Sequence, residues 1–423
     1  MANITQAVPE TASSSSSPRG TYIILGLLCY VSLCSFLRLR RRDAMEKKFG
    51  YTDLASLASM TNADAQKIMS YLAELEFPKV YLTSLQFALF KTYGIPTISG
   101  LLTATKEFST PENASKRYAD TTILIGEFSS HDPKSERVIK AIARMNFIHS
   151  QYQRSGKISN ADLLYTLSVF ITEPITWVEK FEWRSLTAME KCAIGTFWKA
   201  IGDDMGISYH ELENHKKGWL NGLEFYHDIS AWAQAYEKQY MVPAQSNKQT
   251  ADELVPLLLF FVPKAAQPAA ANVVGVLMGD RLRKAMIYPQ PPPAYFTVAN
   301  IIFGTRKFVL RYLALPRASF MRFRQVSDQP DKKTGRYHWS TYQAHPYYNK
   351  PSFLNRWGPM GLFVWLMGGD VPGSKGDKYI PEGYTFEEVG PRGLKKRGGE
   401  QTREIEERLR LERPSGCPFA VSR

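Results

Sequence analysis

Apolar residues recur at steps of three and four along most of the chain, which is the spacing of one face of an α-helix. The segment 138–152 shows this pattern on a single face, made of Val138, Ile142, Met145, His149 and Tyr152. Helix starts are marked by a capping residue at Thr61 or Asn62 and by Pro111. Alternating apolar and polar residues, which would predict strands, do not continue over a useful length. The pattern therefore predicts an all-α fold.

The N-terminal part departs from this pattern with an uncharged apolar run at residues 21–37, TYIILGLLCYVSLCSFL. At about 1.5 Å per residue the run spans roughly 25 Å as a helix, the short end for a membrane anchor. The polar, serine-rich residues 1–20 predict a disordered tail. The run has neither the basic start nor the cleavage site of a signal peptide. We therefore expect a retained single-pass transmembrane helix.

Basic residues directly after the apolar run suggest how the anchor is oriented; they are Arg38, Arg40, Arg41 and Arg42. The positive-inside rule places such residues in the cytosol. The tail is then lumenal and the large body is cytosolic. In the opposite orientation the sequon at Asn113 would be open to glycosylation.

The rest of the chain divides by composition. Residues 47–325 are predicted to form a large helical domain, which would carry any catalytic site. Residues 326–423 are rich in Pro, Gly and Tyr and predict an irregular extension that ends in a charged surface helix, REIEERLRLERP. Two further apolar stretches, at 254–263 and 361–368, are too short to span a bilayer, and we expect both to be buried in the core.

The net charge of the chain limits the classes of partner that it is expected to bind. The 423 residues have a formal net charge of +13 and an apolar content of 44%. Such a charge suits nucleic acid or an anionic membrane, but no finger spacing, RNA-binding signature or basic zipper is present, so we expect no nucleic-acid partner. Between Ile301 and Ser327 basic and large apolar residues alternate without one acid. This stretch either lies on the cytosolic leaflet or forms an ordinary basic surface.

Candidate chemical groups are few. The four cysteines show no zinc or redox spacing. His210 and His215, in HELENH, are five apart and cannot share a metal on a helix in the usual way, so we expect a solvated loop. His149 stands in an apolar stripe, where a buried imidazole needs a hydrogen-bond partner or a metal. From the residues alone, a core histidine is the more common case.

A second candidate lies in KRYADTTILIG at 116–126. Arg117 and Thr121 share a helix face, and Asp120 lies beside them. These three residues form either a surface salt bridge with a neighbouring hydroxyl or one wall of a pocket that faces the His149 helix. The residue types do not decide between the two.

Longer strings carry a family resemblance. They include LEFPKVYLTSLQFALFKTYGIPTISGLL, KRYADTT, FIHSQYQRSGKISNADLLYTL, RKFVLRYL and NRWGPM. They resemble the family that joins the fungal ER-bound oxygenases of mycophenolic acid biosynthesis (the mpaB branch) to bacterial latex clearing protein, a rubber oxygenase. Similarity to the mpaB branch extends from KKFG near the anchor to GCPF near the end. Similarity to the rubber oxygenases is confined to an Arg-x-x-x-Thr helix, an Arg…His helix and a Trp-x-x-x-Gly helix.

The resemblance implies a globin-like helical core that holds a b-type haem (haem b). His149 matches the proximal haem ligand of the rubber oxygenases, and Arg117 and Thr121 match residues of the distal helix. The distal lysine of that motif is replaced here by Asp120. We expect Asp120 to pair with Arg117, to direct it toward oxygen, and to leave the sixth iron position open. We also expect an acceptor that orients the second nitrogen of His149.

The resemblance also implies a reaction. It is the oxidative cleavage of a C=C bond in the farnesyl-type side chain of a meroterpenoid intermediate in fungal secondary metabolism. The expected partners are a prenylated aromatic substrate, O2 and the endoplasmic reticulum membrane, where a greasy substrate resides. Two alternatives stay open: a haem- or lipid-binding membrane protein without turnover, and a hydroxylase or epoxidase that acts on a prenylated substrate.

Overall fold

The computed structural model describes residues 18–106, 108, 110–341, 345–413 and 416–419. These residues confirm the predicted all-α class, since they form helices, irregular segments and only isolated bridges in place of strands. The α-helices are α1 (Pro18–Phe49), α2 (Leu54–Leu57), α3 (Asn62–Tyr71), α4 (Pro78–Thr92), α5 (Pro96–Ala104), α6 (Pro111–Ser130), α7 (Glu136–Gln153), α8 (Asn160–Phe181), α9 (Ala188–Asp204), α10 (Gly222–Tyr240), α11 (Gln245–Leu258), α12 (Gln267–Ala285), α13 (Pro293–Phe308), α14 (Phe353–Trp357), α15 (Pro359–Leu366) and α16 (Gly399–Glu412). Shorter turns are the π-helical η1 (Leu72–Glu76) and η3 (Val309–Leu313) and the 3-10 turns η2 (Lys264–Ala266), η4 (Ser319–Met321), η5 (Gly376–Tyr379), η6 (Phe386–Glu388) and η7 (Arg392–Leu394).

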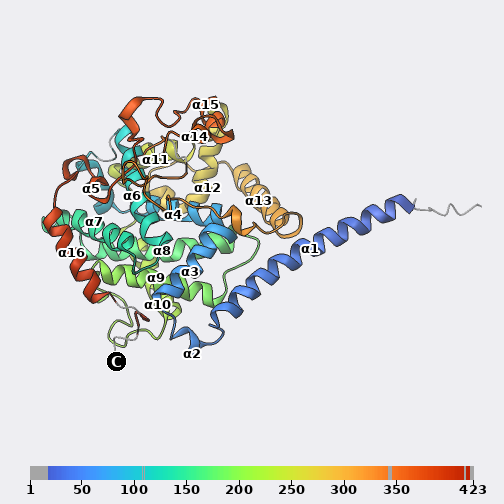
Figure 1. Ribbon diagram of the computed structural model, residues 1–423, viewed down its shortest axis with the longest axis horizontal. Coiled ribbons are helices and arrows are strands. Elements are labelled where there is room, and N and C mark those ends of the chain that lie inside the picture. Colours follow the sequence, from blue (N-terminus) through green and yellow to red (C-terminus); the bar gives the residue numbers. More distant parts are fainter. Residues whose placement is uncertain (1–17, 107, 109, 342–344, 414–415, 420–423) are drawn as a thin grey trace, which may run out of the picture.

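The helix α1 contains the predicted anchor and is longer than the apolar run 21–37. Within the described residues it is the one helix long and apolar enough to cross a membrane. Its apolar side chains are exposed, for example Tyr22 at 73% and Ile24 at 59%. Figure 1 shows this helix projecting from the body. Most of the predicted tail at 1–20 lies outside the described residues, and residues 18–20 already belong to α1.

The helix α1 is fixed to the body, from Tyr30 onward, by hydrogen bonds to the segment after α13. The Tyr30 hydroxyl donates to the Leu313 carbonyl at 3.0 Å. Arg38 donates to the carbonyls of Ala314, at 3.0 Å, and Leu315, at 3.3 Å. Arg38, the first of the basic residues behind the apolar run, is therefore buried against protein. The helix leaves the body next to α13 and η3.

The core is centred on α8, which is buried on nearly all sides and packs against α4, α9 and α10. Two predicted helix starts are confirmed. The Thr61 hydroxyl accepts a hydrogen bond from the Asp64 amide at 3.1 Å, which caps α3, and Pro111 opens α6. The globin-like arrangement of this core stays a prediction. The division of the body into residues 47–325 and 326–423 also stays a prediction.

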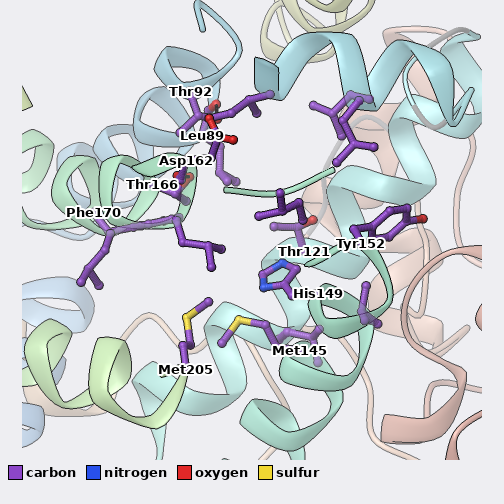
Figure 2. Close-up of a pocket in the computed structure, with 18 of the residues that line it drawn as sticks. Leu89, Thr92, Thr121, Met145, His149, Tyr152, Asp162, Thr166, Phe170 and Met205 are labelled. Carbon is purple, nitrogen blue, oxygen red and sulfur yellow. Dashed lines mark hydrogen bonds between the residues drawn. The ribbon is translucent and has the colours of Figure 1, made fainter. Parts of the chain in front are cut away.

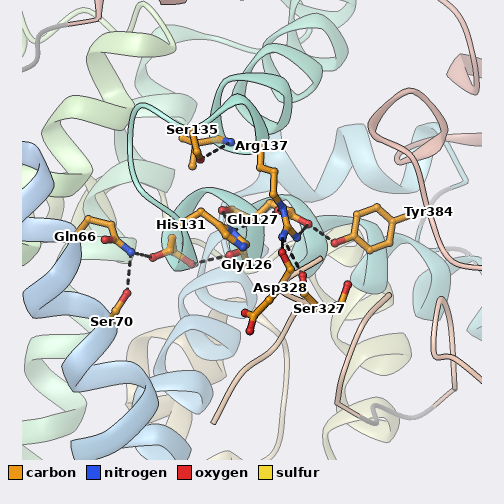
Figure 3. Close-up of polar contacts among 12 residues, drawn as sticks. Gln66, Ser70, Gly126, Glu127, His131, Ser135, Arg137, Ser327, Asp328 and Tyr384 are labelled. Atoms are coloured by element: carbon orange, nitrogen blue, oxygen red, sulfur yellow. Dashed lines mark hydrogen bonds and ion pairs between the residues drawn. The ribbon is translucent and has the colours of Figure 1, made fainter. Parts of the chain in front are cut away.

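The chain after residue 325 is fastened to α6 and α7 by charged side chains. Figure 3 shows Glu127 of α6 at the centre of one such contact. Arg137 of α7 binds its carboxylate with Nη2 at 2.7 Å and Nε at 2.9 Å, and Tyr384 donates to the same carboxylate. Arg137 also donates to the carbonyls of Ser327 and Asp328, each at 2.9 Å. The bidentate ion pair thus joins two core helices to two separate parts of the C-terminal segment.

Arg144 also fixes the C-terminal segment to α7. Its side chain leaves the helix on the face opposite to the one that carries His149. The side chain is 1% exposed. It donates to three carbonyls of the C-terminal segment, those of Val389 at 2.9 Å, Leu394 at 2.8 Å and Arg397 at 3.0 Å. The helix that carries His149 is therefore backed by chain from the far end of the sequence.

We expect Arg144→Met to lower the free energy of unfolding by about 3 kcal/mol, because three carbonyls lose one buried, charged donor. Trypsin should then cut faster in the segment around Lys395 and Arg397. The control is Arg154→Met on the exposed end of the same helix, where a change within about 0.5 kcal/mol is expected. Equal unfolding midpoints and equal cleavage rates for the two variants would contradict this role.

The two short apolar stretches, 254–263 and 361–368, differ in how far they are buried. Part of 254–263 is buried as expected, at Leu254, Val255 and Leu259. The expectation is wrong for 361–368, most of which forms α15. There Leu362 is 48% exposed and Leu366 is 76% exposed. Apolar composition shows that a segment avoids water, but it does not show that the segment packs against its own protein.

Candidate functional site

A cavity of about 200 Å³ lies among α4, α5, α6, α7, α8 and α9. Its walls are mainly apolar, and among the polar residues on them are Arg117, Thr121 and His149. Figure 2 shows the His149 ring facing the open centre, with Thr121 on one side and Met145 and Met205 on the other. The structure therefore favours the pocket interpretation of the 116–126 segment over the surface salt bridge.

His149 has the properties of an uncharged ligand. Its Nδ1 atom is buried and has no hydrogen-bond partner among the described residues. Burial, followed by the positive charge of Arg117, lowers the pKa of His149 to about 4. The imidazole is thus neutral at physiological pH, which is the state that binds metals. The acceptor that we expected behind the ring is not found in the described part of the chain, so that expectation is wrong.

Arg117 and Thr121 belong to the stripe of α6 that lines the cavity together with Leu124, Ile125 and Phe128. The Thr121 hydroxyl donates to the Arg117 carbonyl at 2.9 Å, so its proton is held by its own helix. The Arg117 guanidinium is half-buried, and the structure gives it no ion pair or hydrogen bond with any described residue. A cation in such surroundings gains most from an anionic or electron-rich ligand.

Asp120 does not pair with Arg117, so this prediction is wrong. The carboxylate is 2% exposed, accepts from Lys116 Nζ at 2.6 Å, and accepts from the Tyr348 hydroxyl at 2.7 Å. The helix geometry explains the outcome, because a step of four places Lys116 closer to the direction of Asp120 than the step of three from Arg117 does. Asp120 does not line the cavity. Burial raises its pKa, against the opposing effect of Lys116.

Several residues on the cavity wall were not predicted from the sequence. Lys157 comes from the loop between α7 and α8, and Trp198 comes from α9. The carboxylate of Asp162 accepts a hydrogen bond from the Thr97 hydroxyl at 2.6 Å and so joins α8 to α5. Two of them had a signal in the sequence: Asp162 forms a capping box with Ser159, and Trp198 opens the Trp-x-x-x-Gly string of the resemblance.

The two histidines of HELENH, His210 and His215, lie in turns, as expected. His210 is within 2.9 Å of the Ser208 hydroxyl, and Nδ1 of His215 is within 2.7 Å of the Leu212 carbonyl. Among the residues that the structure describes, no group of three His, Cys, Asp or Glu side chains is placed to hold a metal ion.

The residues on the cavity wall fit a b-type haem by chemical type. Haem iron needs one axial protein ligand, which a neutral His149 can supply. The apolar walls suit the macrocycle, and Lys157 is a cation that suits its propionates. The cavity is smaller than the roughly 300–1,000 Å³ of typical cofactor sites. Flexible wall residues such as Met145 and Met205 would have to turn aside for the macrocycle.

The low pKa of His149 predicts a pH effect on the haem-free protein. Below about pH 6.5 the unfolded chain takes up a proton at His149, whereas the folded chain does so only near a pKa of about 4. Stability is therefore lost as the pH falls, by about 2 kcal/mol from pH 7 to pH 5. His149→Gln should lose less over this interval, and the exposed-site control His210→Gln should behave as the unmodified chain. Thermal unfolding in detergent, followed by circular dichroism, measures both. Parallel melting curves for the two variants would refute the assignment.

Comparison with known proteins places the chain in a family. No family model matches it. The chain is 45% identical to ER-bound oxygenase mpaB' of Penicillium brevicompactum, over 94% of both chains. It is 42% identical to ER-bound oxygenase mpaB of the same species, over 87% of this chain and 88% of the relative. It is 46% identical to mpaB of Penicillium roqueforti over 62% of this chain and 88% of that relative. With identities of this size over nearly the whole length, the chain belongs to the mpaB family of ER-bound oxygenases.

Proposed function

We propose that this protein is a haem-dependent oxygenase that cleaves a C=C bond in the prenyl side chain of an aromatic substrate at the endoplasmic reticulum membrane. The observation that carries the proposal is the neutral His149, which faces an apolar cavity. It shares this cavity with Arg117, which has no ion-pair partner among the described residues. Family membership supports an oxygenase with a small-molecule substrate and O2. The apolar walls suit a prenyl chain.

His149, Arg117 and Asp120 have different roles in this proposal. A bound haem would supply the binding and activation of O2. His149 is the residue that would hold its iron, through a neutral ring nitrogen. Arg117 stabilises negative charge that develops on oxygen during the reaction, in surroundings where little water screens the charge. Asp120 has an indirect role. It binds Lys116 and Tyr348, and none of these three residues lines the cavity.

The reaction balances without an added reductant. One oxygen atom of O2 forms a double bond to each alkene carbon as the C=C bond breaks. A trisubstituted prenyl alkene then gives one aldehyde and one ketone. Oxidation of the aldehyde to an acid would be a separate step. A hydroxylase or epoxidase would instead place one oxygen atom in an intact carbon skeleton.

Product analysis with ¹⁸O2 tests the proposal. Full-length, haem-loaded protein in nanodiscs is incubated with a farnesylated phenol, and the products are read by mass spectrometry. We expect two shorter carbonyl compounds, each carrying one ¹⁸O atom when exchange with water is limited by rapid reduction to alcohols. A hydroxylated or epoxidised product would favour the second reaction class. Intact substrate with fully loaded protein would favour a binding protein without turnover.

We further propose that the N-terminus of α1 is lumenal and that the body is cytosolic, on the basis of the arginines behind the apolar run. Protease added to sealed microsomes should digest the body completely, whereas a lumenal marker protein in the same microsomes should stay intact. A protected body that carries a glycan on Asn113 would reverse the orientation.

A further inference from the structure

The segment from Phe353 to Gly369 forms a strongly apolar surface on the body. Its outward side chains include Phe353 at 80% exposure, Leu354 at 71%, Trp357 at 57%, Trp365 at 65% and Leu366 at 76%. Arg356 is the one charged residue in these seventeen positions. A contiguous exposed surface of this kind marks an interaction site.

The segment is built as a tight helical hairpin. Two short helices, α14 and α15, meet at Gly358, where a Cβ atom would lie 2.3 Å from the Leu354 carbonyl oxygen. At Gly361 a Cβ atom would lie 2.5 Å from the Arg356 carbonyl oxygen. Both positions therefore need glycine for the helices to approach so closely.

One face of the hairpin is fixed to the body. Val364 is 1% exposed and lies against Gly369, which also meets the ring of Phe260. The Phe363 ring stacks on Phe261, with 6.2 Å between ring centres. The outer residues Leu362, Trp365 and Leu366 stand at helical spacing on the other face. The exposed side chains are thus held outward by a packed base.

The position of the hairpin indicates what covers it. In Figure 1, α13 and the pair α14–α15 lie along one side of the body, and α1 projects toward that same side. The chain beside α1 is also apolar and exposed, with Ile301 at 61%, Phe308 at 56% and Phe320 at 90%. A bilayer crossed by α1 therefore meets both surfaces. The tryptophans suit its interface, where such rings gather.

We propose that the α14–α15 hairpin is a second membrane contact, which lies in the plane of the leaflet and inserts its outer face among the lipids. Short helices with one apolar face bind lipid in this manner. The contact would fix the height and tilt of the body, which α1 alone leaves free to rotate. The proposal does not depend on haem or on turnover.

Depth-dependent quenching tests the proposal with full-length protein in nanodiscs of phosphatidylcholine and phosphatidylserine. The exposed Cys29 is first changed to serine. A polarity-sensitive fluorophore is then attached at Leu366→Cys or at the control Leu411→Cys. Leu411 is 86% exposed on α16, which Figure 1 shows on the opposite side of the body. We expect blue-shifted emission and quenching by spin-labelled lipids at position 366, and neither at position 411.

A second pair of variants separates lipid contact from misfolding. The fluorophore is moved to Phe353→Cys, and Trp365→Glu/Leu366→Glu is compared with Leu411→Glu. Burial of one large apolar side chain shifts a docking equilibrium by about tenfold or more. The double variant should therefore lose quenching at position 353 and keep its helical circular dichroism, and Leu411→Glu should change neither.

Two results would overturn the proposal. In the first, positions 366 and 411 are equally unquenched, which would leave the hairpin in water. In the second, the emission at 366 is blue-shifted without lipid quenching, and the shift disappears when each disc holds a single copy. That result would assign the surface to contact with a second copy of the chain.

Discussion

His149→Ala is expected to abolish haem binding. The purified variant should lose its Soret absorbance, and its affinity for haem should fall by more than about 100-fold, since even the loss of a residue that only orients a metal ligand costs about 10- to 100-fold. Among the described residues that line the cavity, His149 is the one histidine, and no cysteine stands beside it. Haem content is measured after conversion to the pyridine complex, independently of turnover.

The folded state should survive this change. The Nδ1 atom of His149 is already buried with no partner in the described part of the chain, so alanine removes an unsatisfied polar atom along with the ring. The helical circular dichroism should be retained, and added imidazole should restore part of the Soret band. His210→Ala, on an exposed turn, controls for haem bound elsewhere. A variant that retains full haem and full activity would make His149 a core histidine.

The sequence predicted which residues share a helix face, but it left open whether the faces of α6 and α7 meet in a pocket. Periodicity placed His149 on the inner face of α7 and put Arg117 and Thr121 on one face of α6. The cavity confirms that these two faces meet. Such predictions succeed because helical spacing is a local property, fixed by the backbone within one turn. The resemblance then singled out His149, which residue types alone had favoured as a core histidine.

The failures have a local and a long-range cause. Asp120 was assigned to Arg117, although Lys116, four residues before it, lies closer in direction on the helix. No local rule could foresee its second partner, Tyr348, which lies 228 residues away. Arg144 likewise binds carbonyls more than 240 residues away. The exposure of α15 was missed for a related reason. Hydropathy gives the same signal for a segment that packs on protein and for one that faces lipid.

Arg117→Met is the second change with a large expected effect. Turnover should fall by about 100- to 1,000-fold, the usual cost of removing one donor that stabilises developing negative charge on oxygen. Haem content should be retained, because the iron ligand is on another helix. If the loss lies in kcat, Arg117 acts on the reacting oxygen; if it lies in KM, Arg117 binds an anionic group of the substrate. Arg154→Met, on the exposed end of α7, is the control for loss of positive charge.

The same variant has a second readout that a purely structural role would not give. Two effects lower the pKa of His149: burial is the larger, and the positive charge of Arg117 is the second. Without the guanidinium, the pKa of His149 should rise toward its ordinary value. The pH at which the haem-free protein loses stability should then move upward in Arg117→Met and stay fixed in Arg154→Met. Arg117→Lys should keep the low pKa, because the charge remains, yet should lose turnover, because the planar donor is absent. An Arg117→Met protein with unchanged turnover and an unchanged His149 titration would remove Arg117 from the site.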